Sequence, residues 1–449
     1  MDLFAGDFGC LLAAGLGRSS EKCPAGERPQ SPSRAHRFGR ERSGTPKFYP
    51  PRPVRILFLS QRVPFPPNRG DKITTWRLIE RLAREHPVDV VSFIHDEEDR
   101  AACAELERRG FGVHGVELGT PLQQKLRSLP GVLCGQPLTL GYYGSAKLQR
   151  VVDGLAPHAD LIYAYSSSMG AFMRPYDQAF RVMHFAELDS DKWKQYAARE
   201  KFPMSWVYAR EHRTLLRFEQ AVAAEVDESV FCTPLEQGLF EREIPGCSSV
   251  VMRNGVDLTA LQPDESLRED DHLAFCGVMD YLPNIDGCEW FAREILPRVR
   301  QQRPQARFTI VGSRPTPEVR ALGELPGVHV TGFVDEPKDW LLKASVSVAP
   351  LRIARGIQNK VLEALALGLP VVGTTSATQG VEGTPEEHFL VRDDLEGQVS
   401  AVLALLEDPQ RALELGRAGR RFVEERYDWE VALAPLDDLL ARTAAKRGR

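Results

Sequence analysis

The chain has 449 residues, of which 43% are hydrophobic and 27% charged, and its formal net charge is -5 at pH 7. This length accommodates two domains of ordinary size, and the composition is that of a globular protein. The negative net charge argues against binding of nucleic acid through bulk charge, and no apolar run approaches the ~20 residues that a bilayer-spanning helix needs.

Residues 1–53 differ in composition from the rest of the chain. They are rich in Arg, Ser, Pro and Gly and show no periodic apolar pattern, so we expect a disordered tail. The apolar piece within it, FGCLLAAGLG, lacks the basic leader and the length of a signal peptide. The eight cysteines of the chain form no Cys-x-x-Cys pair, which favours reduced side chains in a cytoplasmic protein.

A buried parallel strand is predicted at Val54–Ser60. A loop with three prolines and Gly70 leads from this strand into a helix, and a glycine loop before a helix N-terminus is a favourable place for an anion. Further strands and helices alternate through the first half of the chain. This alternation predicts a doubly wound parallel sheet with helices on both faces.

Polar side chains follow the predicted strand FRVMHFA. His184, Glu187 and Asp189 lie at or just beyond its carboxyl end, where folds of this kind bind their ligands. A single histidine in such a place is more often a hydrogen-bonded structural residue than a catalyst. We nevertheless keep His184 as a candidate catalytic residue, with a structural role as the alternative.

A long helical stretch from Asp191 to Val222, interrupted at Pro203, is rich in basic and aromatic side chains. Seven Lys or Arg stand between Asp191 and Arg217 against three acidic residues. Such a face suits an anionic membrane surface and would allow a peripheral contact with the inner face of the cytoplasmic membrane. The alternative is a solvated face that packs its two tryptophans into the core.

A second run of strands and helices begins with the strand HLAFC. Gly277 and Gly312 each end a predicted strand, and a helix is expected from Asn284. The first loop, GVMDYLPN, contains no basic residue. A diphosphate bound in a closed cleft would therefore need cationic partners from elsewhere in the chain.

The stretch Ser345–Thr374 predicts a strand, a loop, a helix and a strand. Its loop carries Arg352 and Arg355, and its helix is expected to start near Ile357. Two guanidinium groups, the amides of a helix N-terminus and Lys360 in the first turn together indicate a phosphate site. The alternative is an ordinary βαβ unit with solvated charges on its loop.

Three segments of the chain resemble a known family. They read FLSQRVPFPPNRGDKITTWRLIERLA, LDSDKWKQYA and APLRIARGIQNKVLEALALGLPVV, and they are similar to family 4 glycosyltransferases. More narrowly, they resemble the sugar transferases associated with PEP-CTERM/exosortase exopolysaccharide systems. The likeness implies an α/β protein of GT-B architecture, in which two Rossmann-like domains with doubly wound parallel sheets face a cleft.

The resemblance also implies the domain boundaries. An acceptor-side domain is expected at 54–256, with the interdomain turn NGVD at its end. A nucleotide-sugar donor domain is expected at 257–428. The segment 429–449 resembles a tail helix that returns toward the first domain.

The resemblance implies roles for individual residues. Glu363 fits the second of two glutamates of the family pattern and is expected to bind the nucleotide ribose, whereas the first position holds Arg355. The resemblance also implies that His184 faces the transferred sugar. The diphosphate is assigned to Arg352, Arg355 and Lys360 from the charges of the loop and helix themselves. The other expected donor-binding residues are Gly70, Gly277, Asn284, Gly312, Arg314, Val334, Gly356, Ile357, Gln358 and Asn359.

These features and the resemblance together predict a hexosyltransferase of the EC 2.4 class, which moves a sugar from a nucleotide-diphosphate sugar to an exopolysaccharide or a polyprenyl-linked saccharide. That the transfer is retaining is implied by the resemblance alone. The ten histidines are scattered, so we expect metal-independent transfer, with the nucleotide sugar as co-substrate and no cofactor. The alternatives are a non-catalytic nucleotide-sugar-binding protein and a sugar-nucleotide epimerase of the same fold. The lack of a Gly-x-Gly-x-x-Gly sequence after a strand argues against an NAD-dependent dehydrogenase.

Overall fold

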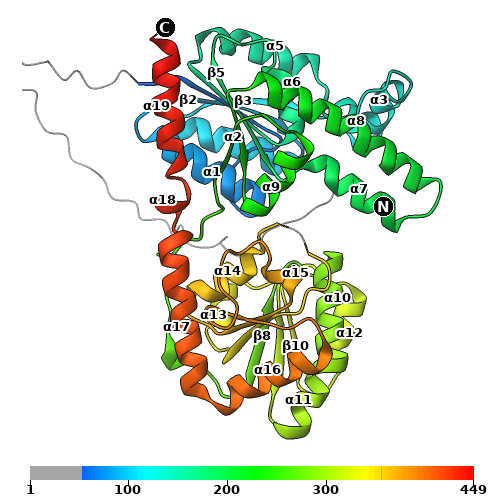
Figure 1. The fold of residues 1–449 in the computed structure, drawn as a ribbon, viewed down its shortest axis with the longest axis vertical. Helices are drawn as coiled ribbons and strands as arrows, with labels where there is room; N and C mark the ends of the chain where they lie inside the picture. Colours follow the sequence, from blue (N-terminus) through cyan, green and yellow to red (C-terminus); the bar gives the residue numbers. More distant parts are fainter. Residues whose placement is uncertain (1–52, 355, 449) are drawn as a thin grey trace, which may run out of the picture.

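The computed structural model describes residues 53–354 and 356–448. The expected disordered tail, apart from Pro53, and Arg355 lie outside the described residues. Figure 1 shows two α/β units, one above the other, with helices packed around each sheet.

The first unit is built on a sheet of seven parallel strands in the spatial order β3-β2-β1-β4-β5-β6-β7. Every residue of β1 and β4 is buried, which explains their continuous apolar sequences. The strand order reverses between β1 and β4, and ligands bind at such a switch point. The strands are β1 (Ile56–Ser60), β2 (Val88–Ile94), β3 (Gly112–Glu117), β4 (Leu161–Tyr165), β5 (Phe180–Ala186), β6 (Glu228–Phe231) and β7 (Ser249–Val251).

Helices cover both faces of this sheet. The long helical stretch that the sequence predicts is broken near Pro203 as expected, because proline has no backbone N–H for the helix ladder. The two resulting helices, α7 and α8, pack against each other. The helices are α1 (Gly70–Ala83), α2 (Glu97–Arg108), α3 (Pro121–Leu133), α4 (Leu138–Tyr143), α5 (Ala146–Leu155), α6 (Gly170–Met173), α7 (Asp189–Arg199), α8 (Met204–Glu225) and α9 (Pro234–Glu243).

The second unit contains six parallel strands in the order β10-β9-β8-β11-β12-β13. These are β8 (His272–Cys276), β9 (Arg307–Val311), β10 (Val328–Gly332), β11 (Val346–Ala349), β12 (Val371–Gly373) and β13 (Leu390–Val391). Its order also reverses, between β8 and β11, so both sheets follow the doubly wound pattern.

The helices of the second unit start close to their expected positions. The helix expected near Ile357 begins two residues later, at Asn359, and the helix expected from Asn284 begins at Leu282. The helices are α10 (Leu282–Trp290), α11 (Leu296–Gln302), α12 (Pro317–Leu322), α13 (Pro337–Leu341), α14 (Asn359–Ala366), α15 (Thr375–Thr378), α16 (Leu395–Glu407) and α17 (Pro409–Arg426).

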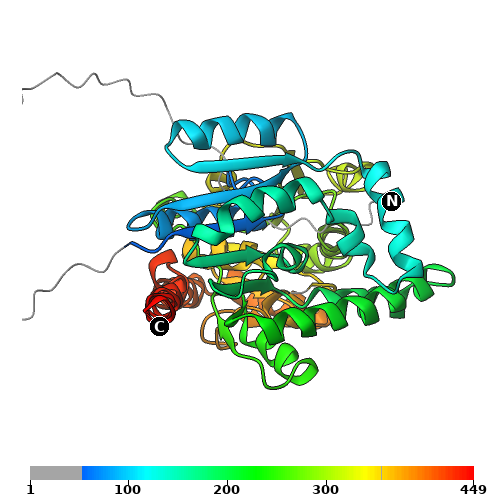
Figure 2. The same cartoon turned by 90° about the horizontal axis from the view of Figure 1, so that it is seen from above.

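The chain returns to the first unit after α17. The short α18 (Trp429–Ala432) leads into α19 (Pro435–Arg447), which lies along the first unit in both views (Figures 1 and 2). Leu436 and Leu439 of α19 belong to an apolar cluster of the first sheet, and Lys446 Nζ binds both oxygens of Asp227 at 2.9 Å. The C-terminal helix therefore ties the two units together.

Candidate functional site

A cavity of about 230 Å³ lies between the two units. Its walls come from the loops that follow β1, β4, β5 and β6 in the first unit and from the start of α14 in the second. The cavity thus stands at the carboxyl ends of the first sheet, next to the switch point between β1 and β4, where a doubly wound fold binds its ligand.

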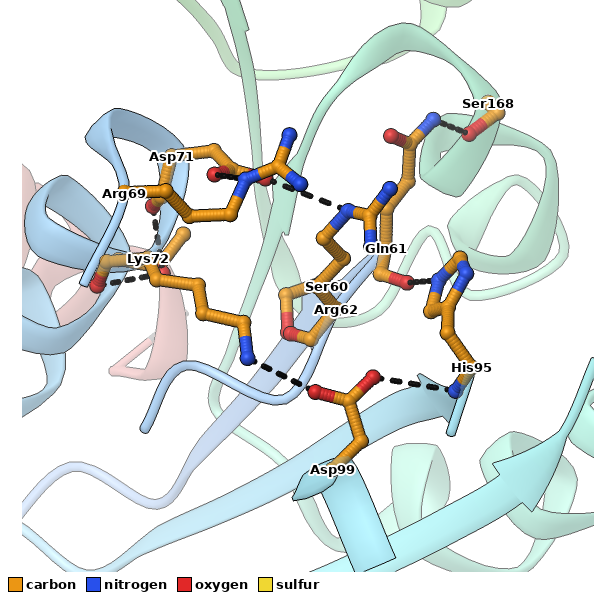
Figure 3. A network of polar contacts seen from close by, with 10 residues as sticks. Ser60, Gln61, Arg62, Arg69, Asp71, Lys72, His95, Asp99 and Ser168 are labelled. Carbon is orange, nitrogen blue, oxygen red and sulfur yellow. Dashed lines mark hydrogen bonds and ion pairs between the residues drawn. The ribbon is translucent and has the colours of Figure 1, made fainter. Parts of the chain in front are cut away.

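Two arginines share one carboxylate at the start of α1. Asp71 Oδ1 accepts a hydrogen bond from Arg69 Nε at 2.7 Å, and Asp71 Oδ2 lies 3.7 Å from Arg62 Nε (Figure 3). All three residues line the cavity together with Gly70. Because α1 has no side-chain cap, its amides and the two guanidinium groups make this corner attractive to an anion.

A buried ion pair supports this corner. Lys72 Nζ donates to Asp99 Oδ1 at 2.8 Å, and Asp99 Oδ2 accepts from the backbone N–H of His95 at 3.0 Å (Figure 3). His95 Nε2 lies 2.9 Å from the carbonyl oxygen of Gln61, a residue of the cavity wall. The loop before α1 and the start of that helix are therefore fixed to the start of α2 by a buried ion pair and its hydrogen bonds.

The second unit reaches the cavity through Ile357 and Asn359. Helix α14 has no side-chain cap, and Asn359 Oδ1 is buried with no hydrogen-bond partner among the described residues. Lys360 Nζ donates to Gln358 Oε1 at 3.2 Å and lies 5.6 Å from the centre of the Phe275 ring. The predicted residues 357–360 thus surround an uncapped helix N-terminus, which attracts anions.

Gly356 brings this loop into close contact with the first unit. Its φ of 63° lies in the left-handed region, and a Cβ atom here would stand 2.1 Å from Glu187 Oε1. On the other side, a Cβ atom on Gly380 would stand 2.2 Å from the carbonyl oxygen of Gly356. Glycine is needed at both places because the backbones approach too closely for a side chain.

Glu363 is buried on α14 and lines a second, smaller cavity of about 50 Å³. Arg77, Asp257 and Trp429 line the same space, next to the turn that joins the two units. Asn359 lines both cavities, so they meet at the start of α14. The ribose contact expected for Glu363 stays a prediction.

Arg352 makes its contacts within the second unit and does not line the cavity. Its Nε and a terminal nitrogen bind the two carboxylate oxygens of Asp286 on α10, at 3.0 and 2.5 Å. Its guanidinium carbon lies 5.4 Å from the centre of the Trp290 ring. The hydrogen-bonded Asp286 carboxylate raises the pKa of Arg352 above its ordinary value. The guanidinium group of Arg352, which the sequence assigned to the diphosphate, is therefore bound to Asp286 in this structure.

His184 is buried inside the first sheet, which corrects its expected position in the crevice. Its Nδ1 lies 2.8 Å from the hydroxyl oxygen of Tyr163, and its ring centre lies 4.7 Å from that of Tyr165. Burial lowers the pKa of His184 to about 3. Tyr165 lines the cavity, whereas His184 lies behind it, so these surroundings favour the structural alternative.

Three predicted donor residues lie together beyond β8 and β9. A Cβ atom on Gly312, at a φ of 152°, would stand 1.7 Å from the carbonyl oxygen of Gly277. Asn284 is buried, and its Nδ2 donates to the carbonyl oxygen of Val278 at 2.8 Å. These residues shape the first loop of the second unit, but they do not line the 230 Å³ cavity.

Arg314 and Val334 lie farther along the same edge of the second sheet. Arg314 has a φ of 54°, and its Nε lies 3.3 Å from Asp280 Oδ2. Val334 packs against the core of the second unit, while its neighbour Phe333 is 73% exposed. The base contacts expected near Val334 stay a prediction.

Acidic and aromatic side chains also line the cavity. Glu187 and Asp189 line the cavity beside Phe185 and Trp193. Sequence reasoning placed the two carboxylates at a strand end. It gave Phe185 no role and considered Trp193 only for the helical face or the core, because buried and cavity-lining rings have the same local pattern. It also passed over Arg62, since an arginine in a proline-rich loop has no distinguishing spacing.

The described part of the chain contains neither a group of metal ligands nor a membrane-spanning helix. Within residues 53–354 and 356–448, no three His, Cys, Asp or Glu residues group as a metal site would require. No helix in these ranges is both long enough and apolar enough to cross a membrane. The two carboxylates of the sequence Asp189-Ser190-Asp191 bind other side chains, Ser167 and Gln195.

Comparison with known proteins gives a match in the second unit. Residues 270–408 match the family model described as glycosyl transferases group 1. The chain is 30% identical over 157 residues to the GDP-mannose-dependent monoacylated alpha-(1-6)-phosphatidylinositol monomannoside mannosyltransferase of Corynebacterium glutamicum, which covers 32% of this chain and 41% of that protein. It is 27% identical over 261 residues to a glycogen synthase of Mycobacterium tuberculosis, with coverage of 54% and 60%. The chain thus spans less than two thirds of the length of these relatives.

Solved structures match over most of the chain. Sucrose-phosphate synthase from Thermosynechococcus elongatus superimposes with a TM-score of 0.64 at 18% identity, covering 87% of this chain and 99% of that one. Anabaena HepE in complex with UDP gives a TM-score of 0.63 at 16% identity, with coverage of 87% and 100%. These likenesses, together with the two parallel sheets, confirm the predicted GT-B fold.

Proposed function

We propose that this protein is a glycosyltransferase that moves a sugar from a nucleotide-diphosphate sugar to a saccharide acceptor. One observation carries the proposal. The uncapped N-terminus of α14 faces, across a 230 Å³ cavity, the polar strand ends of the first sheet, and α14 lies within the residues that match the glycosyltransferase model. Similarity to GDP-mannose-dependent mannosyltransferases and to a UDP-binding protein supports a nucleotide-sugar donor.

The chemistry required of such a site is modest. Negative charge grows on the departing diphosphate in the transition state, and preorganised amides and cations that face it lower the barrier. We assign this role to Lys360 and the backbone amides of residues 357–359, which lie at the uncapped start of α14. Arg352 would join them by exchanging Asp286 for the diphosphate, and Glu363 would bind the ribose. Transfer with retention is part of the same proposal and derives from the family resemblance. Transfer without a metal or other cofactor is also part of it and derives from the scattered histidines of the sequence.

The acceptor belongs to the saccharides carried by a lipid or a growing exopolysaccharide. The mannosyltransferase relative acts on a phosphatidylinositol monomannoside, which is a lipid-linked saccharide. The resemblance to transferases of PEP-CTERM systems points to the same class. A lipid-linked acceptor requires the enzyme to work at a membrane surface on the cytoplasmic side.

The α7–α8 tip, defined by the exposed residues Lys194, Arg199, Lys201, Phe202 and Trp206, suits such a surface. Phe202 is 82% and Trp206 is 55% exposed, whereas Trp193, the other tryptophan of this stretch, packs into the core. Exposed rings among cations favour an anionic interface, and each nearby Lys or Arg contributes about 1 kcal/mol. In Figures 1 and 2 the tip lies at the opposite side of the first unit from α19.

Sedimentation with lipid vesicles tests this contact. Binding to phosphatidylglycerol vesicles is expected at low salt and should disappear at high salt, because ions screen the attraction. A Phe202→Ser/Trp206→Ser variant should sediment less, whereas Leu267→Ser, an exposed apolar residue of the second unit, should behave as the unmodified protein does. Absence of binding at low salt would make the tip an ordinary solvated surface.

Donor turnover tests the proposed function against its two rivals. UDP-glucose and GDP-mannose are incubated with the protein, with and without p-nitrophenyl glycosides as acceptors. A glycosyltransferase releases nucleoside diphosphate faster when an acceptor is present. A sugar-nucleotide epimerase converts the donor without any acceptor, and a binding protein shows calorimetric affinity for UDP or GDP without turnover.

A further inference from the structure

A serine-rich turn meets the start of α7 in the first-unit half of the cavity. Ser166 follows β4 and Ala186 ends β5, and both line the cavity with positive φ values of 78° and 63°. The backbone N–H of Ser166 donates to the carbonyl oxygen of His184 at 2.9 Å, which joins the two strand ends. Non-glycine residues held in this region of φ store strain, and such strain concentrates at functional sites.

A buried chain of hydrogen bonds leads from this turn to Asp189. Ser167 Oγ lies 2.8 Å from Asp189 Oδ2 and 3.2 Å from Glu219 Oε1, and the N–H of Ser190 also donates to Glu219 Oε1, at 3.3 Å. Ser167 and Glu219 are completely buried. A serine hydroxyl has one proton and can donate to only one of the two carboxyl groups. Two ionised carboxylates around one hydroxyl would repel each other, and the completely buried Glu219 is out of reach of water that could screen its charge.

The charge state of Glu219 resolves this conflict. Burial, together with the charge of Asp189, raises the pKa of Glu219 to about 8, so Glu219 is neutral at pH 7 and Ser167 donates to Asp189. Other ionisable groups nearby bind backbone atoms of α7 instead: Glu236 accepts from the N–H of Leu188, and His212 Nδ1 lies 2.9 Å from the carbonyl oxygen of Ser190.

Because Ser167 holds Oδ2 of Asp189, the other carboxylate oxygen, Oδ1, is left for a ligand. Asp189 lines the cavity, and its Oδ1 has no hydrogen-bond partner in the described part of the chain. Tyr143, Phe185 and Trp193 line the same cavity. A carboxylate that accepts hydrogen bonds, beside aromatic faces that pack against apolar C–H groups, matches the mixed surface of a sugar ring.

We propose that Asp189 binds a hydroxyl group of the acceptor saccharide and that Ser167 and Glu219 are positioning residues that hold its carboxylate. The inference rests on the proposed function and names the acceptor half of the same cavity. The donor half is formed by Ile357 and Asn359 at the start of α14, across the cavity. Substitutions at Asp189 should therefore affect the acceptor and leave the nucleotide unaffected.

Two measurements on each variant separate these halves. Calorimetry gives the affinity for UDP and GDP, and initial rates give the KM for p-nitrophenyl glycosides at saturating UDP-glucose or GDP-mannose. Asp189→Asn is expected to raise the acceptor KM about tenfold or more, since a charged acceptor of a hydrogen bond is lost, with nucleotide affinity within about twofold of the original. Asp191→Asn is the matched control, because Asp191 lies two residues further along α7 and binds Gln195. It should change neither the acceptor KM nor the nucleotide affinity.

Glu219 is tested by two substitutions with opposite outcomes. Glu219→Gln is neutral and nearly isosteric, so it should keep the acceptor KM at pH 7, whereas Glu219→Ala should raise it. In the unmodified protein the acceptor KM should rise above about pH 8, where Glu219 ionises, and Glu219→Gln should lack this rise. Equal effects of the two substitutions, or a pH profile unchanged in Glu219→Gln, would show a merely structural role.

Three other results would contradict either the acceptor assignment or the proposed function. An unchanged acceptor KM in folded Asp189→Asn would overturn the inference. Affinity for UDP or GDP without transfer to, or binding of, any glycoside would overturn the saccharide assignment while the donor site stands. Absence of nucleotide affinity in the unmodified protein would instead contradict the proposed function itself.

Discussion

Glu219 is a side chain whose burial makes the stability of the protein depend on pH. Its pKa rises from an ordinary 4.5 to about 8 in the fold. Between these values the folded protein keeps a proton that the unfolded chain has released, so the free energy of unfolding falls as pH rises through this window. The fall is about 1.4 kcal/mol per pH unit for one proton.

Glu219→Gln should remove this dependence. The difference in unfolding free energy between the variant and the unmodified protein is expected to grow in favour of the variant from about pH 5 to about pH 8, and to stay constant above that. Urea unfolding at a series of pH values measures it. A difference that does not vary with pH would mean that Glu219 is ionised in the folded protein at all these values.

Glu363 is expected to bind the ribose of the nucleotide donor. Replacement by Ala removes a carboxylate that would accept hydrogen bonds from the ribose, which should weaken nucleotide affinity by about 1 to 3 kcal/mol. Calorimetric titration with UDP and GDP measures the loss, and circular dichroism checks the fold, since Glu363 is buried. Unchanged affinity in the folded variant would remove Glu363 from the nucleotide site.

At the residue scale the sequence predicted which side chains carry charge, but not which partners they meet. Arg352 looked available for a phosphate, yet Asp286 on another helix binds it. His184 stands at a strand end in the sequence, yet the neighbouring strand covers it with Tyr163 and Tyr165. Such pairings depend on how the strands and helices pack, and no local spacing encodes them.

At the element scale, the proposed donor binding depends most on the geometry of the loop before α14. Gly356→Ala would place a methyl group against Glu187 Oε1 at a φ of 63°. We expect a loss of roughly 1 kcal/mol or more of stability from the backbone alone. Displacement of the loop should in addition weaken UDP or GDP binding severalfold, because the amides at the helix start would shift from their places.

Gly246→Ala is the matched control for this loop. Gly246 also has a positive φ, of 84°, but a Cβ atom there would meet nothing within 4 Å. It should therefore lose a similar amount of stability to backbone strain and keep its nucleotide affinity. Thermal unfolding and calorimetry on both variants separate strain from contact. Equal nucleotide affinity in the two variants would argue against a role of this loop in donor binding.

The elements themselves were largely predictable. Continuous apolar runs such as VRILFLS predict strands buried on both faces, and the helix break near Pro203 follows from the chemistry of proline. Helix starts were displaced by two residues at α10 and α14. Neither end has a side-chain cap, which is the usual mark of the first residue. At α10 the remaining start signal is Pro283 in the first turn.

At the scale of the whole molecule, long-range contacts set the cavity. Arg253 and Glu382 form a two-pronged ion pair between the units, at 2.5 and 2.8 Å, and α19 returns to the first sheet. The family resemblance predicted the GT-B fold, because its motifs cover both sheets. The acceptor wall was not predictable, since Ser167, Asp189 and Glu219 come from three separate elements and meet only after folding.

Sugar transfer itself tests the central claim most directly. UDP-glucose or GDP-mannose is supplied with p-nitrophenyl glycosides, and the glycosylated product is detected by mass and by the coupling constant of its new anomeric proton. We expect a product with the anomeric configuration of the donor. We also expect a drop in turnover in Lys360→Ala of about tenfold or more, while Lys343→Ala, a lysine beside Trp340 and away from the cavity, keeps the original rate. Nucleotide binding without any glycosylated product, or equal rates in the two lysine variants, would contradict the account.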